Sequence, residues 1–452
     1  MTTLHAGQAL TPSGWLRDVR IVVEDGRIAS VQANAAAEAN DEVCAVLLPA
    51  VGNVHSHAFQ RGMAGLAETR GSSADSFWSW RDTMYRFALS MTPEQVEAVA
   101  AQLYVEMLEA GFGRVGEFHY LHHDRNGQPY AAPAEMAQRI VAAAGDTGIG
   151  LTLLPVFYAH AGFGGIAPSP LQRRFVCGLD LYARLLEESR AAVAALPGGV
   201  VGVAPHSLRA VTPDELGHVL DMAGGGPIHI HVAEQMREVE DCRTWSGARP
   251  VQWLLEHAAV DPRWCLIHAT HMTGEENEAV VRRGATVGLC PITEASLGDG
   301  VFDASRFVAA GGRFGIGSDS NVLVGLGDEL RQLEYSQRLK LRARNVLAQP
   351  GGSTGRFLFD AALAGGAAAL GAPLCGLAPG APADMVSLDV DDVAFAGRGG
   401  DALLDSLVFS ARGTGVDSVW TAGRKRVEAG RHVERERVAE RFRRVMADLA
   451  SR

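Results

Sequence analysis

Histidine and carboxylate residues stand at the ends of several short apolar runs of the sequence. His55 and His57 end the first of these runs, and residues two apart in a strand point to the same side, so both imidazoles are expected on one wall. Further along the chain, His231, His268 and Asp319 lie at the ends of three other runs. Three imidazoles and a carboxylate from different strands form a ligand set that Zn²⁺ accepts, with one position left for water.

We predict that the metal ligands are His55, His57, His231 and Asp319. A lone histidine on a strand is more often a hydrogen-bonded core residue, but its recurrence at several strand ends favours metal binding. His229 faces the same side as His231, and we prefer His231 because Glu234 lies one short turn beyond it and can approach a water at the metal. We expect structural or supporting roles for the other histidines nearby, namely His119, His122, His123, His160 and His271.

The elements that must position these side chains are eight apolar runs that alternate with helix-length amphipathic stretches. The runs are Ala45–His57, Arg114–Tyr120, Gly150–Tyr158, Val200–Ser207, Pro227–Glu234, Trp264–His271, Ala285–Thr293 and Arg313–Ser320. Alternation of this kind indicates a parallel sheet with crossover helices, and eight strands predict a (β/α)₈ TIM-type barrel. Active sites of such barrels lie at the carboxyl ends of the strands, which is where the polar residues fall.

The two ends of the chain have a different pattern. Residues 1–48 contain short strands joined by turns, and turn-rich β character returns after Leu370. We therefore predict a small β-sandwich domain formed from residues 1–48 and 373–452, with a terminal helix at about Glu434–Ala450, and a barrel domain at 49–372.

Composition limits the classes of partner. The chain has 452 residues, 47% of them hydrophobic, and a net charge of -11, which argues against a nucleic acid or an anionic membrane as partner. The expected partner is a small-molecule substrate. The six cysteines form no CxxC pair, and no signal peptide or membrane-spanning run stands out, so we expect reduced thiols and a cytoplasmic location.

The HxH after the first run, the HxxE after the fifth, the histidine after the sixth and the aspartate after the eighth resemble the amidohydrolase superfamily along nearly the whole chain. Many members hold two metals bridged by a carboxylated lysine in mid-barrel. This chain has only Lys340, after the eighth run, and Lys425, near the end, so neither can lie at a middle strand. The resemblance then implies one Zn²⁺ per chain, as in deaminases of this superfamily.

That resemblance implies roles for three polar residues in catalysis. Zinc lowers the pKa of its bound water to about 7, which supplies a hydroxide nucleophile, and Asp319 takes the proton. His268 would hydrogen-bond the hydroxide or the tetrahedral centre, and Glu234 would carry the proton to the departing nitrogen. Taken singly, Glu234 could be a carboxylate at a helix N-terminus and His268 a core histidine.

Within the superfamily the sequence is most similar to the N-formimino-L-glutamate deiminase family of histidine degradation. The similarity lies in four segments: residues 55–62 (HSHAFQRG), 77–81 (FWSWR), 117–120 (EFHY) and 205–209 (PHSLR). It implies a substrate pocket formed by Gln60, Arg81, Tyr120, His206 and Arg209. A substrate with two carboxylates favours bidentate arginine partners, although an arginine in a loop more commonly forms a surface ion pair.

The resemblance therefore implies hydrolysis of N-formimino-L-glutamate to N-formyl-L-glutamate and ammonia, by a homodimer. One alternative is an aminohydrolase of a purine, pterin or triazine-like heterocycle on the same scaffold, whose pocket would be lined by aromatic and amide groups. A second is a non-catalytic barrel that forms assemblies, but that class commonly lacks metal ligands that this sequence retains.

Overall fold

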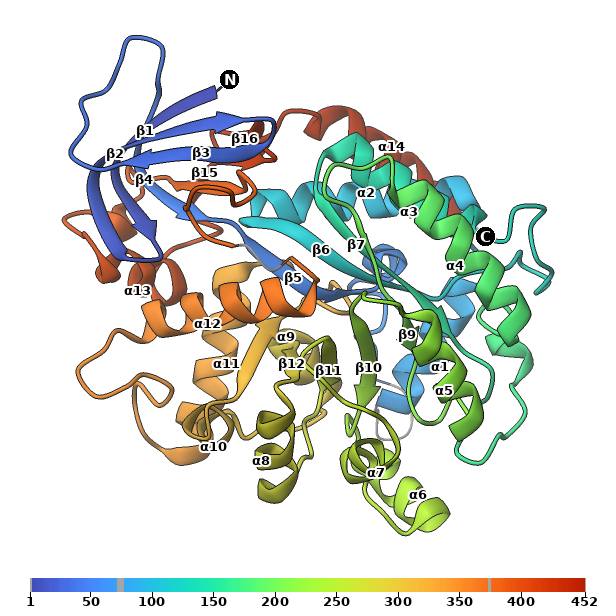
Figure 1. Ribbon diagram of the computed structural model, residues 1–452. Coiled ribbons are helices and arrows are strands. Elements are labelled where there is room, and N and C mark those ends of the chain that lie inside the picture. Colours follow the sequence, from blue (N-terminus) through green and yellow to red (C-terminus); the bar gives the residue numbers. More distant parts are fainter. Residues whose placement is uncertain (1, 71–76, 373–374, 452) are drawn as a thin grey trace.

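Two sheets organise the protein, and a computed structural model describes residues 2–70, 77–372 and 375–451. One sheet is a parallel barrel in the middle of the chain and the other combines the two chain ends (Figure 1). The barrel strands are β5 (Val51–Ser56), β6 (Phe112–His119), β7 (Gly150–Phe157), β8 (Val200–Val201), β9 (Ala204–Pro205), β10 (Ile228–Val232), β11 (Trp264–His268), β12 (Thr286–Leu289) and β13 (Arg313–Ile316). The predicted (β/α)₈ barrel is thereby confirmed.

The barrel closes at two places. On one side β13 pairs with β5 in parallel, with Ile316 opposite Asn53. On the other side Val203 and Ser207 form parallel bridges to Ile228 and His231, so β8 and β9 share the fourth position and join β7 to β10. Every strand end that carries a predicted site residue therefore faces one common mouth.

Two of the predicted runs are divided in the structure. The first run is split at Ala50: its first half belongs to β4 (Glu42–Pro49) in the end sheet, and its second half is β5 of the barrel. The fourth run is broken between β8 and β9. Apolar character predicts burial but not which sheet a strand joins, so the sequence could not place these breaks.

The end sheet has the strand order β17-β16-β15-β14-β4-β1-β2-β3. Its remaining strands are β1 (Thr2–Thr11), β2 (Gly14–Glu24), β3 (Arg27–Gln32), β14 (Met385–Leu388), β15 (Val416–Thr421), β16 (Arg424–Glu428) and β17 (Arg431–His432). Its strands enclose an apolar cluster of their own that includes Ile21, Leu47 and Trp420. Both chain ends thus contribute to this domain, as predicted, although their strands form one continuous sheet and not the two sheets of a sandwich.

The domain boundaries 1–48, 49–372 and 373–452 remain our proposal, and positions 1, 373 and 452 lie outside the described residues. The terminal helix α14 (Arg435–Ala450) packs against α2 (Pro93–Glu109) of the barrel rather than on the end sheet alone. Arg441 of α14 forms an ion pair with Glu97 of α2, with 2.8 Å between Nη1 and Oε1.

Helices surround the barrel, among them α2 and α14, and several helices begin at capping sequences. The others are α1 (Phe77–Ala88), α3 (Glu135–Thr147), α4 (Leu179–Val193), α5 (Pro213–Met222), α6 (Met236–Ser246), α7 (Pro250–His257), α8 (Gly274–Arg283), α9 (Pro291–Leu297), α10 (Ala304–Ala309), α11 (Leu326–Leu341), α12 (Thr354–Ala369) and α13 (Asp401–Phe409), with 3₁₀ turns η1 (Ala58–Met63), η2 (Pro170–Gln172) and η3 (Val393–Phe395). Thr92, Thr212 and Thr273 each form a capping box with the residue three positions on. Each box satisfies amide groups that the first helical turn leaves unpaired.

The end of α12 packs against the barrel at the end opposite the candidate site. Leu370, which follows α12, packs against Val54 and Cys265 in a small buried cluster, and its carbonyl accepts a hydrogen bond from Thr152 Oγ1 at 2.8 Å. A Cβ on Gly116 would lie 2.6 Å from Leu370 Cδ2, so the missing side chain makes room for this plug. Leu370 thus fills the barrel interior at the end opposite the candidate site.

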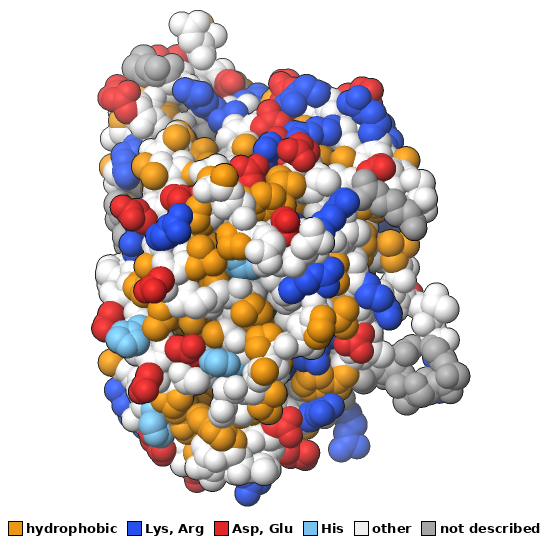
Figure 2. All heavy atoms as spheres, turned by 90° about the vertical axis from the view of Figure 1, so that its right-hand side faces the viewer, with side chains coloured by type: hydrophobic (Ala, Val, Ile, Leu, Met, Phe, Trp, Pro, Cys, Tyr) orange, Lys and Arg blue, Asp and Glu red, His pale blue; other side chains and the backbone are white. Residues whose placement is uncertain are grey.

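The surface shows no continuous basic face in the view of Figure 2, where Lys and Arg side chains are interspersed with Asp and Glu. Within the described part of the chain, none of the helices combines the length and apolar character that crossing a membrane requires.

Candidate active site

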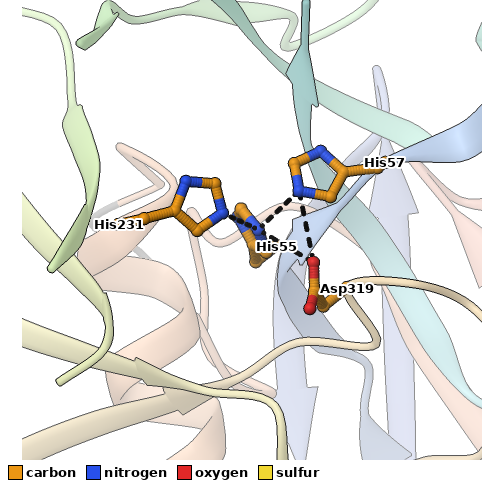
Figure 3. A group of neighbouring side chains, drawn as sticks. All are labelled: His55, His57, His231 and Asp319. Carbon is orange, nitrogen blue, oxygen red and sulfur yellow. Dashed lines mark hydrogen bonds and ion pairs between the residues drawn. The ribbon is translucent and has the colours of Figure 1, made fainter. Parts of the chain in front are cut away.

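Four side chains from three barrel strands converge at the open mouth of the barrel (Figure 3). The Nε2 atom of His55 lies 3.2 Å from Nε2 of His57 and 3.1 Å from Nε2 of His231. Oδ1 of Asp319 lies 3.2 Å from the Nε2 atoms of both His55 and His57. All four predicted ligands are buried, and one ligand atom from each lies within 4.8 Å of the others.

The hydrogen bonds behind two of the rings show that this cluster fits a cation. Nδ1 of His57 lies 2.9 Å from the carbonyl oxygen of Phe118, and Nδ1 of His231 lies 3.0 Å from that of His206. A carbonyl only accepts, so each Nδ1 carries the proton and each Nε2 presents a lone pair. Lone pairs that converge on a carboxylate repel one another unless a cation lies between them, and metal-bound histidines commonly have such a backbone partner.

Burial keeps the ligand set in the form that binds metal. It lowers the pKa of His55 to about 3 and that of His231 well below its usual range, so both rings are neutral near pH 7. The pKa of Asp319 lies well below its ordinary value although burial by itself would raise it, so the carboxylate is ionised. Neutral imidazoles and an ionised carboxylate are the protonation states that metal coordination requires.

The backbone turns sharply where the strands end. Ala233, His268 and Asp319 have φ angles of 52°, 64° and 43°, in the left-handed region that non-glycine residues seldom adopt. Glu238 stabilises one of these turns by accepting the N–H groups of Ala233 and Glu234, both at 3.1 Å. Such strain is concentrated at functional sites, where it aims a side chain.

His268 and Glu234 lie next to the four predicted metal ligands. His268 Nε2 is 3.9 Å from Glu234 Oε1 and 3.9 Å from Asp319 Oδ2. Burial alone would lower the pKa of His268, whereas the surrounding carboxylates, Glu234 foremost, raise it to about 10. Burial raises the pKa of Glu234 to about 6, close to neutrality, where a carboxyl group exchanges protons most effectively.

A pocket opens beside this cluster at the mouth of the barrel. Its lining includes His57, His231 and Asp319 together with Glu234 and His268. The five residues implied to bind substrate line the same cavity: Gln60, Arg81, Tyr120, His206 and Arg209. Gln60 donates from Nε2 to the hydroxyl oxygen of Tyr120 at 2.9 Å, which fixes both side chains. The structure thus brings every predicted site residue except the deeper His55 onto one cavity wall.

The two arginines of the cavity have no ion pair among the described residues. The Nε atoms of Arg81 and Arg209 are buried without a hydrogen-bond partner. The pKa of Arg209 is raised because Glu238 and Glu234 outweigh the effect of burial, so the guanidinium stays charged. A buried cation without a partner is costly, and an anionic ligand in the cavity would compensate it.

Comparison with protein families identifies the family to which a chain with this arrangement belongs. Residues 46–426 match the amidohydrolase family. The chain belongs to the amidohydrolase family. Residues 1–45 of this amidohydrolase match a second family, described as "Formimidoylglutamate deiminase HutF, N-terminal domain".

Individual relatives of this amidohydrolase extend over its full length. A formimidoylglutamate deiminase of Pseudomonas aeruginosa is 51% identical over 99% of this chain and 100% of the relative. The crystal structure of an amidohydrolase from Brucella melitensis is 59% identical, covers 100% of both chains and superposes with a TM-score of 0.97. A zinc-bound adenosine deaminase structure from Xanthomonas campestris has a TM-score of 0.83 at 21% identity over 100% and 99% of the two chains, which shows a shared fold.

Other polar residues of this amidohydrolase lie away from the ligand cluster. Nε2 of His229 lies 2.8 Å from the carbonyl oxygen of Ala369, below the metal ligands, so His231 alone of this pair reaches them. The lysines are equally remote: Lys340 lies on α11 with Nζ 3.5 Å from the carbonyl oxygen of Val301, and Lys425 lies beside Trp420 on the end sheet. A lysine bridge at mid-barrel is therefore absent.

Sequence reasoning missed several supporting residues. Glu294 lies directly after the seventh run, with Oε1 3.2 Å from Nδ1 of His268, and its position at a strand end was the available signal. Asn53 and Asn321 bind Ser318 from two directions, at 2.7 Å and 2.6 Å, and so connect the first and eighth strand ends. Of the aromatic rings that line the cavity, Tyr158 directly follows β7, whereas Tyr85 and Phe175 come from a helix and a loop that a strand-end search does not reach.

Proposed function

We propose that this chain is a zinc-dependent formimidoylglutamate deiminase, which hydrolyses N-formimino-L-glutamate to N-formyl-L-glutamate and ammonia in histidine degradation. The curated relative of that name is 51% identical along nearly the entire chain, and the first 45 residues match the N-terminal domain of that enzyme. The main support for this substrate is a pair of arginines, Arg81 and Arg209. They line the same cavity as the proposed metal ligands and have no ion-pair partner there among the described residues.

The proposed ligands for one Zn²⁺ per chain are His55, His57, His231 and Asp319. A bound zinc ion supplies a Lewis acid that lowers the pKa of water and so provides a nucleophile at neutral pH. Imidazole and carboxylate donors with an open cavity on one side suit a catalytic zinc site.

The proposed proton transfers use groups that face the cavity. In the reaction, water adds to the formimidoyl carbon, the bond to the terminal nitrogen breaks, and ammonia leaves while a formyl carbonyl remains. Asp319 Oδ2 accepts the proton of the water, and His268 Nε2 donates a hydrogen bond to the developing tetrahedral centre. Glu234, whose pKa of about 6 lets it gain and lose a proton near pH 7, delivers protons to the departing nitrogen, which gains two in all, both from the water, and so leaves as ammonia.

Substrate binding is assigned to five side chains. Arg81 and Arg209 bind the two carboxylates through charge-assisted hydrogen bonds. Gln60, Tyr120 and His206 supply neutral hydrogen-bonding groups on the same wall and fix the orientation of the substrate.

A heterocycle aminohydrolase is the second candidate, because Trp80, Tyr85, Tyr158 and Phe175 give the cavity the aromatic lining that a planar ring would use. A 5-methylthioadenosine/S-adenosylhomocysteine deaminase of Natronomonas pharaonis is 28% identical over 86% of this chain and 85% of the relative. We favour the linear amidine because a neutral heterocycle leaves both arginines unpaired.

The deciding experiment is ammonia release from N-formimino-L-glutamate compared with guanine, cytosine and adenosine. The proposal expects turnover of the first compound only, and turnover of a heterocycle alone would overturn it. We further propose a homodimer in the cytoplasm; the six free cysteines suit a reducing compartment, and sedimentation velocity tests the dimer.

A further inference from the structure

Trp78, the second residue of α1, contacts guanidinium groups from three different elements. The Cζ atom of Arg81 lies 4.5 Å from the centroid of the indole, and that of Arg209, after β9, lies 5.9 Å from it. The Cζ atom of Arg237, at the start of α6, lies 4.7 Å from the same ring. Trp78 is not among the residues that line the active-site cavity, whereas Arg81 and Arg209 are.

Gathering three cations around one ring requires a compensating attraction. Among the described residues, Arg81 and Arg209 have no carboxylate partner in ion-pair range, and Arg237 has only Asp241, at 3.7 Å on the exposed surface. The face of an indole carries negative electrostatic potential and attracts a cation within about 6 Å of its centroid. Trp78 therefore supplies an attraction that holds the guanidinium groups without consuming the N–H donors that a carboxylate needs.

We infer that Trp78 is a positioning residue for substrate: its indole holds Arg81 and Arg209 at the spacing that the two carboxylates of one five-carbon diacid require. The inference rests on the proposed function and adds to it a determinant of selectivity for dicarboxylates. Arg81 belongs to α1 and Arg209 to the loop after β9, and the indole of Trp78 is a cation–π contact that both guanidinium groups share.

The test compares Trp78→Leu, which keeps an apolar side chain but removes the ring, with Trp78→Phe, which keeps an aromatic face. For Trp78→Leu we expect KM for N-formimino-L-glutamate to rise about tenfold, with kcat within about threefold of wild type, because the loss of a partly desolvated cation–π contact weakens binding and not the chemical step. Trp78→Phe should recover most of the affinity. The inhibition constant of glutarate, a diacid without the reacting group, should rise in parallel with KM.

Arg237→Ala serves as the matched control. It removes a cation from the same ring, but its side chain is 65% exposed and does not line the cavity, so KM should change less than about threefold. If Trp78→Leu fails to fold, Trp78→Met takes its place, since methionine fills the same space flexibly without a ring.

Equal KM values for the Leu and Phe variants would overturn the inference, because they would show that Trp78 acts by packing and not through the charge distribution of its ring. A fall in kcat at unchanged KM would also overturn it. Failure of the proposed function is recognised separately, as absence of turnover by the wild-type enzyme. In that event glutarate binding by calorimetry to wild type, Trp78→Leu and Trp78→Phe still decides the role of Trp78.

Discussion

At the scale of single residues, the site depends on which atom of each side chain carries a proton. The carbonyl partners of His57 and His231 leave Nε2 free on both rings, which suits the role of metal ligand that we propose for them. Glu234 and His268 have pKa values of about 6 and about 10 only 3.9 Å apart, so the proton equilibrium between them is set by their shared environment.

Replacing Glu234 by Gln should separate metal binding from turnover. The amide keeps the volume of the side chain but cannot deliver a proton, so kcat should fall by about 10² to 10⁴ while zinc content is unchanged. Elemental analysis beside steady-state kinetics measures both. His231→Ala is the matched control and should lose metal and activity together; loss of metal in Glu234→Gln as well would assign the carboxylate to the ligands instead.

Arg209→Ala should weaken recognition of one substrate carboxylate. Loss of two charge-assisted hydrogen bonds is expected to cost about 2–4 kcal/mol in kcat/KM, with fold and metal retained. On an analogue that lacks this carboxylate, the mutation should cost little further, because both changes delete the same contact. Fully additive losses would show that Arg209 has only a structural role.

At the scale of elements, close packing of α12 on the barrel sets the position of β5 and β13. A Cβ on Gly365 of α12 would lie 1.7 Å from the carbonyl oxygen of Phe314, whereas around Gly217 of α5 there is open space. Both glycines are in helix interiors, so intrinsic helix propensity favours alanine equally at the two positions.

Gly365→Ala should therefore destabilise the protein by about 1–3 kcal/mol or more, through overpacking against the strand that precedes Asp319. Gly217→Ala should be neutral or stabilise it by about 0.5–1 kcal/mol. Thermal unfolding of the two variants measures the difference, and similar melting temperatures would mean that α12 shifts without cost.

At the scale of the whole molecule, an ion at the proposed metal site would connect strands that are far apart in the sequence. His55, His231 and Asp319 come from the first, fifth and eighth barrel positions, so an ion held between them links both halves of the barrel. Removing a ligand of the native state that is present at a thousand times its Kd costs about 4 kcal/mol of stability.

The protein should contain one equivalent of zinc, and chelation should abolish activity and lower Tm, both restored by added Zn²⁺. Elemental analysis and thermal unfolding of the purified, metal-depleted and reconstituted protein provide the measurement. Two equivalents of metal, or an unchanged Tm after complete removal, would contradict a single ion shared by these strands.

The sequence by itself determined the barrel, the joining of its two ends into one sheet, and the residues that meet at the mouth. Strand periodicity puts His55 and His57 on one wall, and parallel strands bring their carboxyl ends together wherever they occur in the chain. Those rules depend only on local spacing and strand direction. They do not specify how deep in the barrel each side chain lies. His229 lies one layer below His231, where its Nε2 atom contacts the carbonyl oxygen of Ala369.

Tertiary structure alone decided the division of the first run between two sheets, the support of His268 by Glu294, and the gathering of arginines around Trp78. Each of these depends on contacts between segments far apart in sequence, which the spacing of residues along a strand does not specify. Arg81 and Arg209 are 128 positions apart by number, and only the closed barrel brings their guanidinium groups to one indole, because closure places the loops after the first and fourth strands at the same mouth.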